Sequence, residues 1–334
     1  MTGKQRYLVA SLGSIGLRHL RNLRSLRPES VIAVWRRTAG DPPAEADLQF
    51  STLEEVREFG PAAAIIAGPA SSHVVVADQL MQLGAAIFME KPIAHSLEGV
   101  NELVARSRAL GTIFMVAYNL RFRPDIRHIK DLLESNKIGQ IVSARAEVGQ
   151  YLPDWRPNAD YRTGVSARSD LGGGALLELS HELDYLTWFF GLPKRVTARG
   201  GKFSALEIDV EDLVEILLEY DSPKRLVSVH LDLLQRAPYR AARLVGTAGT
   251  VVWDAGAERV DCFRTETSAW ETQTLPLSDR NAMYVDELRH FLDCLEDGND
   301  PLITGEQAAD VLSIVAAARR SMDDGRTIEV HRRA

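Results

Sequence analysis

The first third of the chain alternates between short apolar runs and longer segments whose apolar residues recur every three or four positions. Short apolar runs are typical of strands buried in parallel sheets, and the longer periodic segments are typical of amphipathic helices. The alternation therefore predicts one doubly wound sheet of six strands with helices between them. Five of these strands are marked by the apolar runs 6–10, 31–35, 62–67, 86–89 and 113–116.

After Asn119 this alternation stops, and longer segments follow in which apolar and polar residues alternate one by one. That period is typical of an antiparallel sheet with one face covered. A polar loop leads into a predicted helix over 175–190, and two more helices are predicted over 284–295 and 306–322. The alternating segments are 141–151, 196–202, 212–220, 226–234, 240–245 and 250–253, with a short last strand at 327–330.

The change of pattern and the length of 334 residues predict two domains. The fold class is α/β: a doubly wound parallel sheet in residues 1–120, then an α+β domain with an open, mostly antiparallel sheet in residues 121–334. The C-terminal helix 306–322 could pack back on the first domain. Because an open sheet leaves one face uncovered, we expect a homo-oligomer, either a dimer or a tetramer.

Composition narrows the class of ligand and the compartment. The formal net charge of −7 argues against nucleic acid or an anionic membrane as a partner, because both select for basic surfaces. Cys262 and Cys294 have neither metal-ligand spacing nor a framework of pairs, which predicts free thiols in the cytoplasm and no metal site. The apolar run 7–10 is too short for a signal peptide or membrane span. A small molecule is the expected ligand.

The turn after the first strand predicts a dinucleotide site. It reads Ser11-Leu12-Gly13-Ser14-Ile15-Gly16 and lies between a strand and a helix. Ser11 stands where the first glycine of the G-x-G-x-x-G pattern would be, whereas Gly13 can admit a pyrophosphate and Gly16 allows close helix packing. The alternative is an ordinary tight turn.

The residues after the second strand predict which nucleotide binds. An NAD site usually has an acidic residue there for the ribose 2′-hydroxyl, but this chain has Arg36 and Arg37, followed by Thr38. A guanidinium can form a charge-assisted fork with a 2′-phosphate, so the pair favours NADP over NAD. The alternative is that both arginines are simply solvated.

Two further stretches carry candidate chemistry. The strand 86–89 ends in Glu90-Lys91-Pro92, which predicts Lys91 at the carboxyl edge of the sheet, where open α/β folds bind ligands. In the helix after Gly172, the residues Glu178, His181 and Asp184 follow at three-residue intervals and would share one face, placing a histidine between two carboxylates for proton transfer. The preceding glycines would let substrate approach the helix start. The alternatives are a surface loop and a solvated helix face.

Together these motifs resemble the Gfo/Idh/MocA oxidoreductases, which include glucose-fructose oxidoreductase and inositol dehydrogenase. The resemblance implies a Rossmann domain, an α/β domain with an open antiparallel sheet, and a cis Lys91–Pro92 bond. It implies that Lys91 contacts substrate and the nicotinamide ribose, that His181 is catalytic, and that Asp184 binds substrate hydroxyls. One position departs: the family commonly has an aspartate four residues before the histidine, where this chain has Leu177, so Glu178 would have to substitute.

The resulting hypothesis is an NAD(P)-dependent oxidoreductase that transfers a hydride between nicotinamide C4 and a secondary alcohol or ketone of a sugar, cyclitol or sugar derivative. The alternatives are an NAD-dependent glycosidase of the same fold and a non-catalytic NADP-sensing regulator. The catalytic residues would be Lys91, His181 and Asp184. The predicted cofactor residues are Ser11, Gly13, Ser14, Ile15, Arg36, Arg37, Gly68, Pro69, His73, Glu90 and Asn119, and the predicted substrate residues are Glu178, Arg121, Trp155, Tyr161, Arg162 and Arg236.

Overall fold

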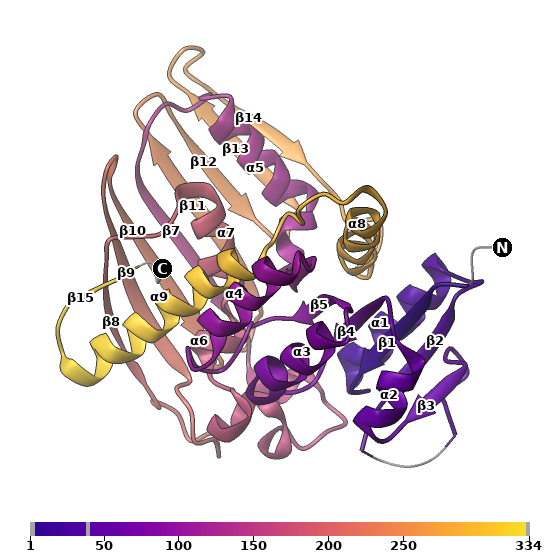
Figure 1. The fold of residues 1–334 in the computed structure, drawn as a ribbon. Helices are drawn as coiled ribbons and strands as arrows, with labels where there is room; N and C mark the ends of the chain where they lie inside the picture. The colour runs from indigo at the N-terminus through magenta and orange to yellow at the C-terminus, as the bar shows by residue number, and fades with distance from the viewer. Residues whose placement is uncertain (1–3, 38–40, 332–334) are drawn as a thin grey trace. The chain divides into compact units, whose positions relative to one another are not determined.

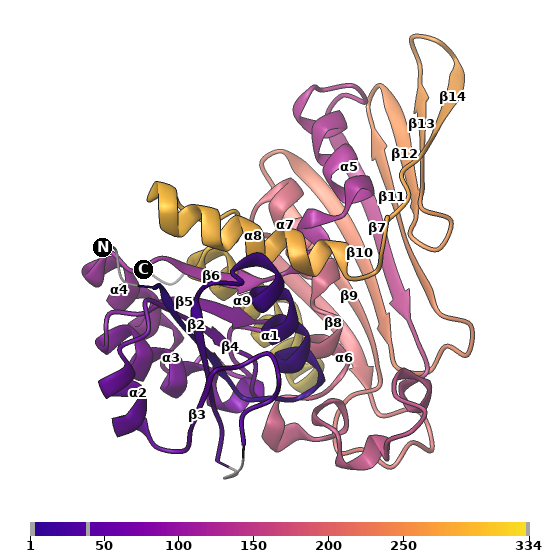
Figure 2. The ribbon, with the colours of Figure 1, turned by 90° about the vertical axis from the view of Figure 1, so that its right-hand side faces the viewer.

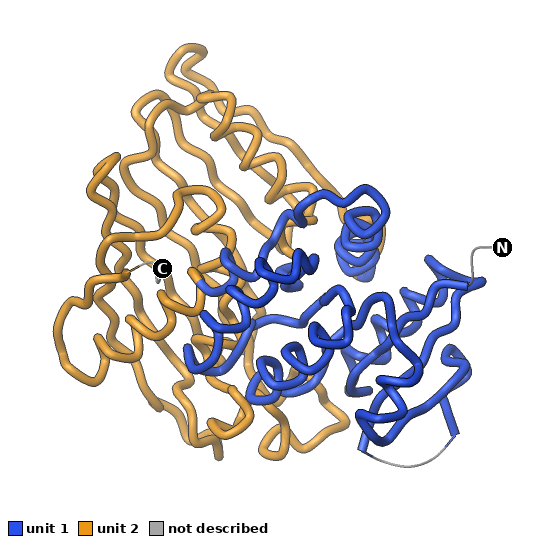
Figure 3. Tube along the Cα trace, in the orientation of Figure 1, with its two compact units in different colours: residues 1–119, 281–309 blue, residues 120–280, 310–334 orange. Residues whose placement is uncertain are grey.

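The computed structural model describes residues 4–37 and 41–331, so Thr38 lies outside the described residues. The chain forms two compact units (Figure 3). The first comprises residues 1–119 and 281–309, and the second comprises 120–280 and 310–334. The predicted domain boundaries, 1–120 and 121–334, stay a prediction. In the division of the chain into compact units, the segment 281–309 belongs to the same unit as the N-terminal sheet.

The first unit is built on a parallel sheet of six strands in the order β3-β2-β1-β4-β5-β6 (Figure 1). This order confirms the predicted doubly wound sheet, and it reverses direction between β1 and β4. β1 and β2 begin and end at the predicted residues. The strands are β1 (Arg6–Ala10), β2 (Val31–Trp35), β3 (Leu48–Phe50), β4 (Ala63–Ile66), β5 (Ala86–Glu90) and β6 (Phe114–Ala117).

Helices cover both faces of this sheet (Figure 2). α1 (Ser14–Leu26) packs against α8 (Ala282–Asp297), and α3 (His73–Gln82) packs against α4 (Val100–Leu110). The short α2 (Leu53–Phe59) begins with a capping box in which Thr52 and Glu55 bond reciprocally. Buried apolar residues of the strands, such as Leu8, Ile65 and Phe88, form the core between the helices.

The second unit is built on a nine-stranded sheet in the order β14-β13-β12-β11-β7-β10-β9-β8-β15. Among the strand pairs of the described residues, β7·β10 is parallel and the others are antiparallel, which confirms the expected mostly antiparallel sheet. The strands are β7 (Ile141–Gly149), β8 (Arg195–Gly201), β9 (Leu213–Asp221), β10 (Lys224–Asp232), β11 (Tyr239–Gly246), β12 (Gly249–Asp254), β13 (Arg259–Arg264), β14 (Ala269–Thr274) and β15 (Ile328–Glu329).

Helices α5 (Pro124–Glu134), α6 (Ala175–Glu178) and α7 (His181–Phe190) lie on one face of this sheet (Figure 2). The predicted single helix over 175–190 is wrong, because it breaks between Glu178 and His181. The hydroxyl of Ser180 donates to the carbonyl of Leu177 at 2.8 Å and ends α6 there. α9 (Gly305–Asp324) begins in the first unit and continues into the second.

Two further observations bear on the class of protein. Among the described residues, none of the helices has the length and apolar character that crossing a membrane requires. Cys262 and Cys294 are both buried free thiols, as predicted.

Candidate active site

The predicted cofactor residues of the first unit lie along one edge of its sheet. Because all six strands are parallel, their carboxyl ends meet at the same edge. Each of five strands is followed there by a predicted residue, and the point where the strand order reverses lies among them. These residues are Ser11 after β1, Arg36 after β2, Gly68 after β4, Lys91 after β5 and Asn119 after β6.

The turn after β1 has the backbone that its glycine pattern predicted, although one glycine is replaced. Ser11 has a φ of +76°, a left-handed conformation that glycine adopts most readily. A Cβ at Gly16 would lie 2.2 Å from the carbonyl oxygen of Ser11, so only glycine allows the helix to pack this closely. A Cβ at Gly68 would lie 3.0 Å from the Ser11 hydroxyl, which places the loops after β1 and β4 side by side.

The N-terminus of α1 is open where a pyrophosphate would bind. Gly13 is the N-cap residue, and no side chain caps the helix there. A Cβ added at Gly13 would meet no atom within 4 Å. Gly13 and Ser14 are exposed, and Ile15 is half-buried. Free N–H groups and the helix dipole make such an end favourable for anions. The geometry therefore fits the predicted contacts of Gly13, Ser14 and Ile15 with a dinucleotide.

Arg36 is held at the end of β2 by neutral partners. Its Nε donates to Oε1 of Gln49 at 2.8 Å, and its Nη2 donates to the carbonyl of Asp41 at 3.3 Å. Arg37 is exposed. Neither of these two acceptors is a carboxylate, so the two hydrogen bonds do not neutralise the positive charge of the guanidinium.

His73 bonds two backbone carbonyls of the neighbouring loops. Its side chain is buried, and its ring nitrogens bond the carbonyls of Pro92 at 2.8 Å and Gly68 at 2.9 Å. Burial lowers the pKa of the imidazole. His73 thus ties the Gly68-Pro69 loop to the cis Lys91–Pro92 peptide, a placement that fits support of the site and not direct contact with a cofactor.

Glu90 and Lys91 differ in their surroundings. The Glu90 carboxylate is buried and bonds Nε2 of His19 at 2.6 Å, while Lys91 is half-buried. The backbone amide of Lys91 donates to Oε2 of Glu90 at 3.2 Å. Sequence reasoning missed His19, because no local pattern links it to Glu90, 71 residues away. Asn119 is also buried.

The second unit carries His181 and Asp184 on α7. His181 is the first residue of that helix and is half-buried, so it lies at the helix start and not in the middle of a longer helix. Glu178 ends α6, and its carboxylate accepts a bond from the Ser166 hydroxyl at 2.9 Å. The three acidic and basic residues therefore do not form one continuous helix face, which corrects the expectation from their spacing.

Asp184 is fully buried and bound to an arginine. Arg121 donates from Nε to Oδ2 at 3.0 Å and from Nη2 to Oδ1 at 2.7 Å, and the Arg121 side chain is only 1% exposed. Burial raises the pKa of Asp184, and Arg121 opposes that shift. This arrangement does not fit the predicted contacts of Asp184 and Arg121 with substrate hydroxyls. It fits a pair that anchors α7.

The glycines before α6 also have a structural explanation. A Cβ at Gly173 would lie 2.3 Å from the carbonyl oxygen of Val165, and a Cβ at Gly174 would lie 2.5 Å from the Glu211 carboxylate. Oε1 of Glu211 accepts a bond from the Leu176 amide at 3.1 Å, so this carboxylate occupies the helix start. The expectation that substrate approaches there stays a prediction, and the close packing gives these glycines a structural explanation beside it. Glu211 lies on a loop far away in sequence, and no local pattern indicated it.

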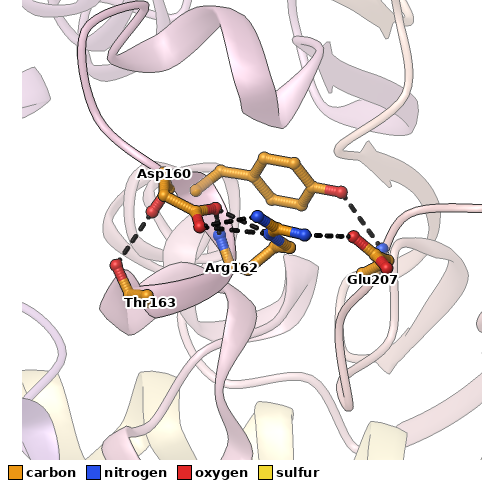
Figure 4. Close-up of polar contacts among 5 residues, drawn as sticks. Asp160, Arg162, Thr163 and Glu207 are labelled. Atoms are coloured by element: carbon orange, nitrogen blue, oxygen red, sulfur yellow. Dashed lines mark hydrogen bonds and ion pairs between the residues drawn. The ribbon is translucent and has the colours of Figure 1, made fainter.

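The remaining predicted substrate residues bind other protein groups. The Arg162 guanidinium bonds Asp160 at 2.9 Å and Glu207 at 2.8 Å (Figure 4), and the Tyr161 hydroxyl accepts from the Glu207 amide. Trp155 Nε1 donates to the Gln150 carbonyl at 3.2 Å. The guanidinium of Arg236 lies over the Tyr151 ring at 3.5 Å. Since two carboxylates already bind Arg162, it is a poor anchor for an anionic substrate.

Comparisons with known proteins agree with this description. Residues 5–118 match the family model for the oxidoreductase family, NAD-binding Rossmann fold, and residues 126–252 match the model for the GFO/IDH/MocA C-terminal domain. The chain is 29% identical over 235 residues to trans-1,2-dihydrobenzene-1,2-diol dehydrogenase of Xenopus laevis, an alignment covering 68% of this chain and 67% of that one. It is 27% identical over 280 residues to D-apiose dehydrogenase of Paraburkholderia graminis, covering 79% and 72%.

Among solved structures, levoglucosan dehydrogenase in complex with NADH superposes with a TM-score of 0.89. The alignment covers 99% of this chain and 100% of that one, at 17% identity. At that identity the likeness shows a common fold.

Proposed function

Because the chain belongs to the Gfo/Idh/MocA family of oxidoreductases, we propose that it transfers a hydride between nicotinamide C4 and a secondary alcohol or ketone carbon of a small polyol. The observation that carries the proposal is the row of predicted cofactor residues at the carboxyl edge of the sheet, with the predicted catalytic residue Lys91 beside them. The relatives named above as diol and sugar dehydrogenases support a sugar, a cyclitol or a sugar derivative as the substrate class.

The first unit would hold the dinucleotide through the turn at Gly13 and the loop at Gly68, and a bound nicotinamide would supply the hydride acceptor. His181, as a neutral imidazole, accepts the hydroxyl proton as the hydride leaves the substrate carbon. Such a general base typically contributes ~10²–10⁴-fold to the rate. Lys91, as an ammonium, stabilises the developing alkoxide charge. Asp184 and Arg121 hold the helix that carries His181.

The nucleotide is proposed to be NADP(H) in preference to NAD(H). In this fold the residue after the second strand lies near the ribose 2′ position. Arg36 occupies that place, and the partners that we describe for it, Gln49 and the Asp41 carbonyl, are uncharged. A 2′-phosphate would give its guanidinium a charged partner, whereas a 2′-hydroxyl would not.

A substrate screen tests the proposed activity. Cyclitols, aldoses, uronates and nucleotide sugars would be incubated with NADP and, in parallel, with NAD, while the absorbance of reduced nicotinamide is followed. Net reduction with at least one polyol, faster with NADP, is the expected result. Release of a glycoside product without net reduction would point to a glycosidase instead, and tight NADPH binding with no turnover across the screen would contradict the proposal.

We also propose a homo-oligomer that covers the exposed face of the nine-stranded sheet. Arg145 on β7 lies directly opposite Arg243 on β11, and like charges in that position are destabilising. Neither guanidinium has an ion-pair partner among the residues described here, so acidic side chains of a second copy would offset their repulsion. Sedimentation velocity tests this: a monomer at all concentrations would exclude it, and R145E/R243E should weaken assembly.

A further inference from the structure

A buried cluster of titratable side chains lies beside the backbone of Lys91. His19 on α1 and Glu287 on α8 are 0% exposed, and Glu90 at the end of β5 is 8% exposed. Their ligand-type atoms all lie within 4.8 Å of one another. Two carboxyl groups and one imidazole thus share a small volume in the core of the first unit. The mechanism above uses none of them directly.

Several atoms of this cluster lack a partner. Both carboxyl oxygens of Glu287 and Nδ1 of His19 make no hydrogen bond within residues 4–37 and 41–331. An ionised carboxylate buried without a partner is strongly unfavourable, and such a group normally takes up a proton instead. The Glu287 carboxyl group must therefore be neutralised, either by a proton or by a metal ion.

A proton explains the geometry better than a metal ion does. Nε2 of His19 and Oε1 of Glu90 are 2.6 Å apart, which is the length of a charge-assisted hydrogen bond. Two ligand atoms each bound at about 2.0–2.1 Å to one ion would lie roughly 3 Å apart or more. The direct contact leaves no place for an ion between them. The His19–Glu90 contact therefore needs no ion, and an ionised Glu287 would place a buried negative charge without a partner beside it.

The surroundings favour the same charge state. Burial and the neighbouring Glu90 hold the pKa of Glu287 well above its ordinary value. Tyr284, which precedes Glu287 by one helical turn, is also near Glu90, and burial raises the pKa of its hydroxyl. The Arg18 guanidinium lies over the Tyr284 ring at 4.4 Å, and the His19 ring meets the Tyr284 ring edge-on at 6.2 Å between centroids.

The cluster is joined to the proposed catalytic lysine through the backbone. Oε1 of Glu90 binds His19, and Oε2 accepts the amide hydrogen of Lys91 at 3.2 Å. Anything that turns the Glu90 carboxyl group therefore changes the hydrogen bond at the residue that carries the ammonium. Glu287 lies close to Glu90 but makes no hydrogen bond with it, so a change in the charge of Glu287 would act on Glu90 through space.

We propose that Glu287 is a neutral, buried carboxylic acid and a positioning residue, which keeps the His19–Glu90 pair in one arrangement and, through Glu90, fixes the backbone of Lys91. The inference rests on the proposed role of Lys91. Loss of the neutral acid, either by ionisation or by truncation, would release Glu90 from its contact with the Lys91 amide.

The test compares Glu287→Gln, a neutral isostere, with Glu287→Ala. The thermal midpoint of unfolding is measured against pH for both variants and the wild type. A raised pKa contributes stability that is complete below the ordinary value of 4.5 and is lost as pH rises through the folded-state pKa. E287Q should lack that loss, so its midpoint should vary less with pH above 4.5. An unchanged pH dependence would overturn the assignment of Glu287 as neutral in the folded state.

Two further measurements need no substrate. The infrared band of a protonated carboxyl group should be present in the wild type at neutral pH and absent in E287Q. Hydrogen exchange of the segment 87–93 should be equally slow in the wild type and E287Q but faster in E287A; equal exchange in all three would exclude the link to Lys91. A stoichiometric metal in the purified protein, together with a lower midpoint in chelator, would overturn the proton in favour of an ion.

Where the substrate screen has given a turnover assay, kinetics add a readout specific to positioning. E287Q should retain kcat within about twofold, because a neutral side chain of the same size is kept, whereas E287A should lower kcat and leave the NADPH dissociation constant nearly unchanged. If E287Q were as inactive as a variant without Lys91, Glu287 would be more than a positioning residue. A wild type without turnover would refute the proposed function alone, since exchange and infrared would still decide the cluster.

Discussion

The guanidinium of Arg121 donates two hydrogen bonds to the carboxylate of Asp184, and neither side chain is more than 1% exposed. Arg121 precedes α5, and Asp184 lies one turn into α7, so the pair joins two segments 63 residues apart in sequence. The carboxylate predicted to meet substrate thus anchors the helix that begins with His181.

Breaking this pair should be strongly destabilising. Arg121→Met leaves a buried carboxylate without its partner, and we expect it to cost about 3–5 kcal/mol in the free energy of unfolding. The double variant R121M/D184L should cost less than R121M alone, because both charges are gone. Urea denaturation measures both. Arg326→Met, in the exposed pair with Asp324, is the matched control and should cost less than about 1 kcal/mol.

His230 should make stability depend on pH in the alkaline range. Its ring bonds Asp232 at 2.9 Å and Glu215 at 2.6 Å, and these carboxylates raise its pKa to about 9. The stabilisation is complete below the ordinary value of 6.5 and is lost as pH rises through about 9. His230→Gln should flatten the thermal midpoint across that window. If the thermal midpoint of both proteins fell equally at alkaline pH, the bonds of His230 to Asp232 and Glu215 would contribute nothing to stability.

Arg36 should discriminate between the two nucleotides. A charge-assisted bond to phosphate is worth about 1.5–3 kcal/mol, so Arg36→Ala should weaken NADPH binding by roughly 10- to 100-fold and leave NADH binding nearly unchanged. Fluorescence titration of both nucleotides measures the ratio. Arg57→Ala, an exposed arginine of the same unit, is the control. Equal affinity of the wild type for the two nucleotides would contradict the preference.

His181 should be needed for the proton and not for the cofactor. His181→Asn keeps a polar side chain of similar size but cannot act as a base at neutral pH. We expect kcat for alcohol oxidation to fall by ~10²–10⁴-fold and the limb of the pH profile that reports the base, the fall in rate at low pH, to disappear, with NADPH affinity retained. A variant with an unchanged pH profile would assign the base to another residue.

Strands could be predicted from the sequence where an apolar run is bounded by turn residues. β1 and β2 are of this kind. β3 is only three residues long with Gln49 at its centre, so it gives no run. β14 is exposed on both faces, and its sequence therefore shows no alternation to detect.

The candidate site could be predicted where the signal is local, as in the glycine turn and the Glu90-Lys91-Pro92 motif. The break before His181 could not, because the three-residue spacing of polar side chains continues through it and the Ser180 hydroxyl closes α6. The partners of Glu90 and Asp184 could not be predicted either. His19 and Arg121 are 71 and 63 residues away from them, and only the fold brings them together.

The role of Lys91 tests the account most directly. Lys91→Met retains the aliphatic chain and removes the ammonium, so single-turnover hydride transfer can be compared after NADPH affinity has been measured. We predict that NADPH binding stays nearly intact while hydride transfer from the substrate found in the screen to NADP is abolished. Transfer at a rate near that of the wild type would contradict the assignment of Lys91 as the catalytic ammonium.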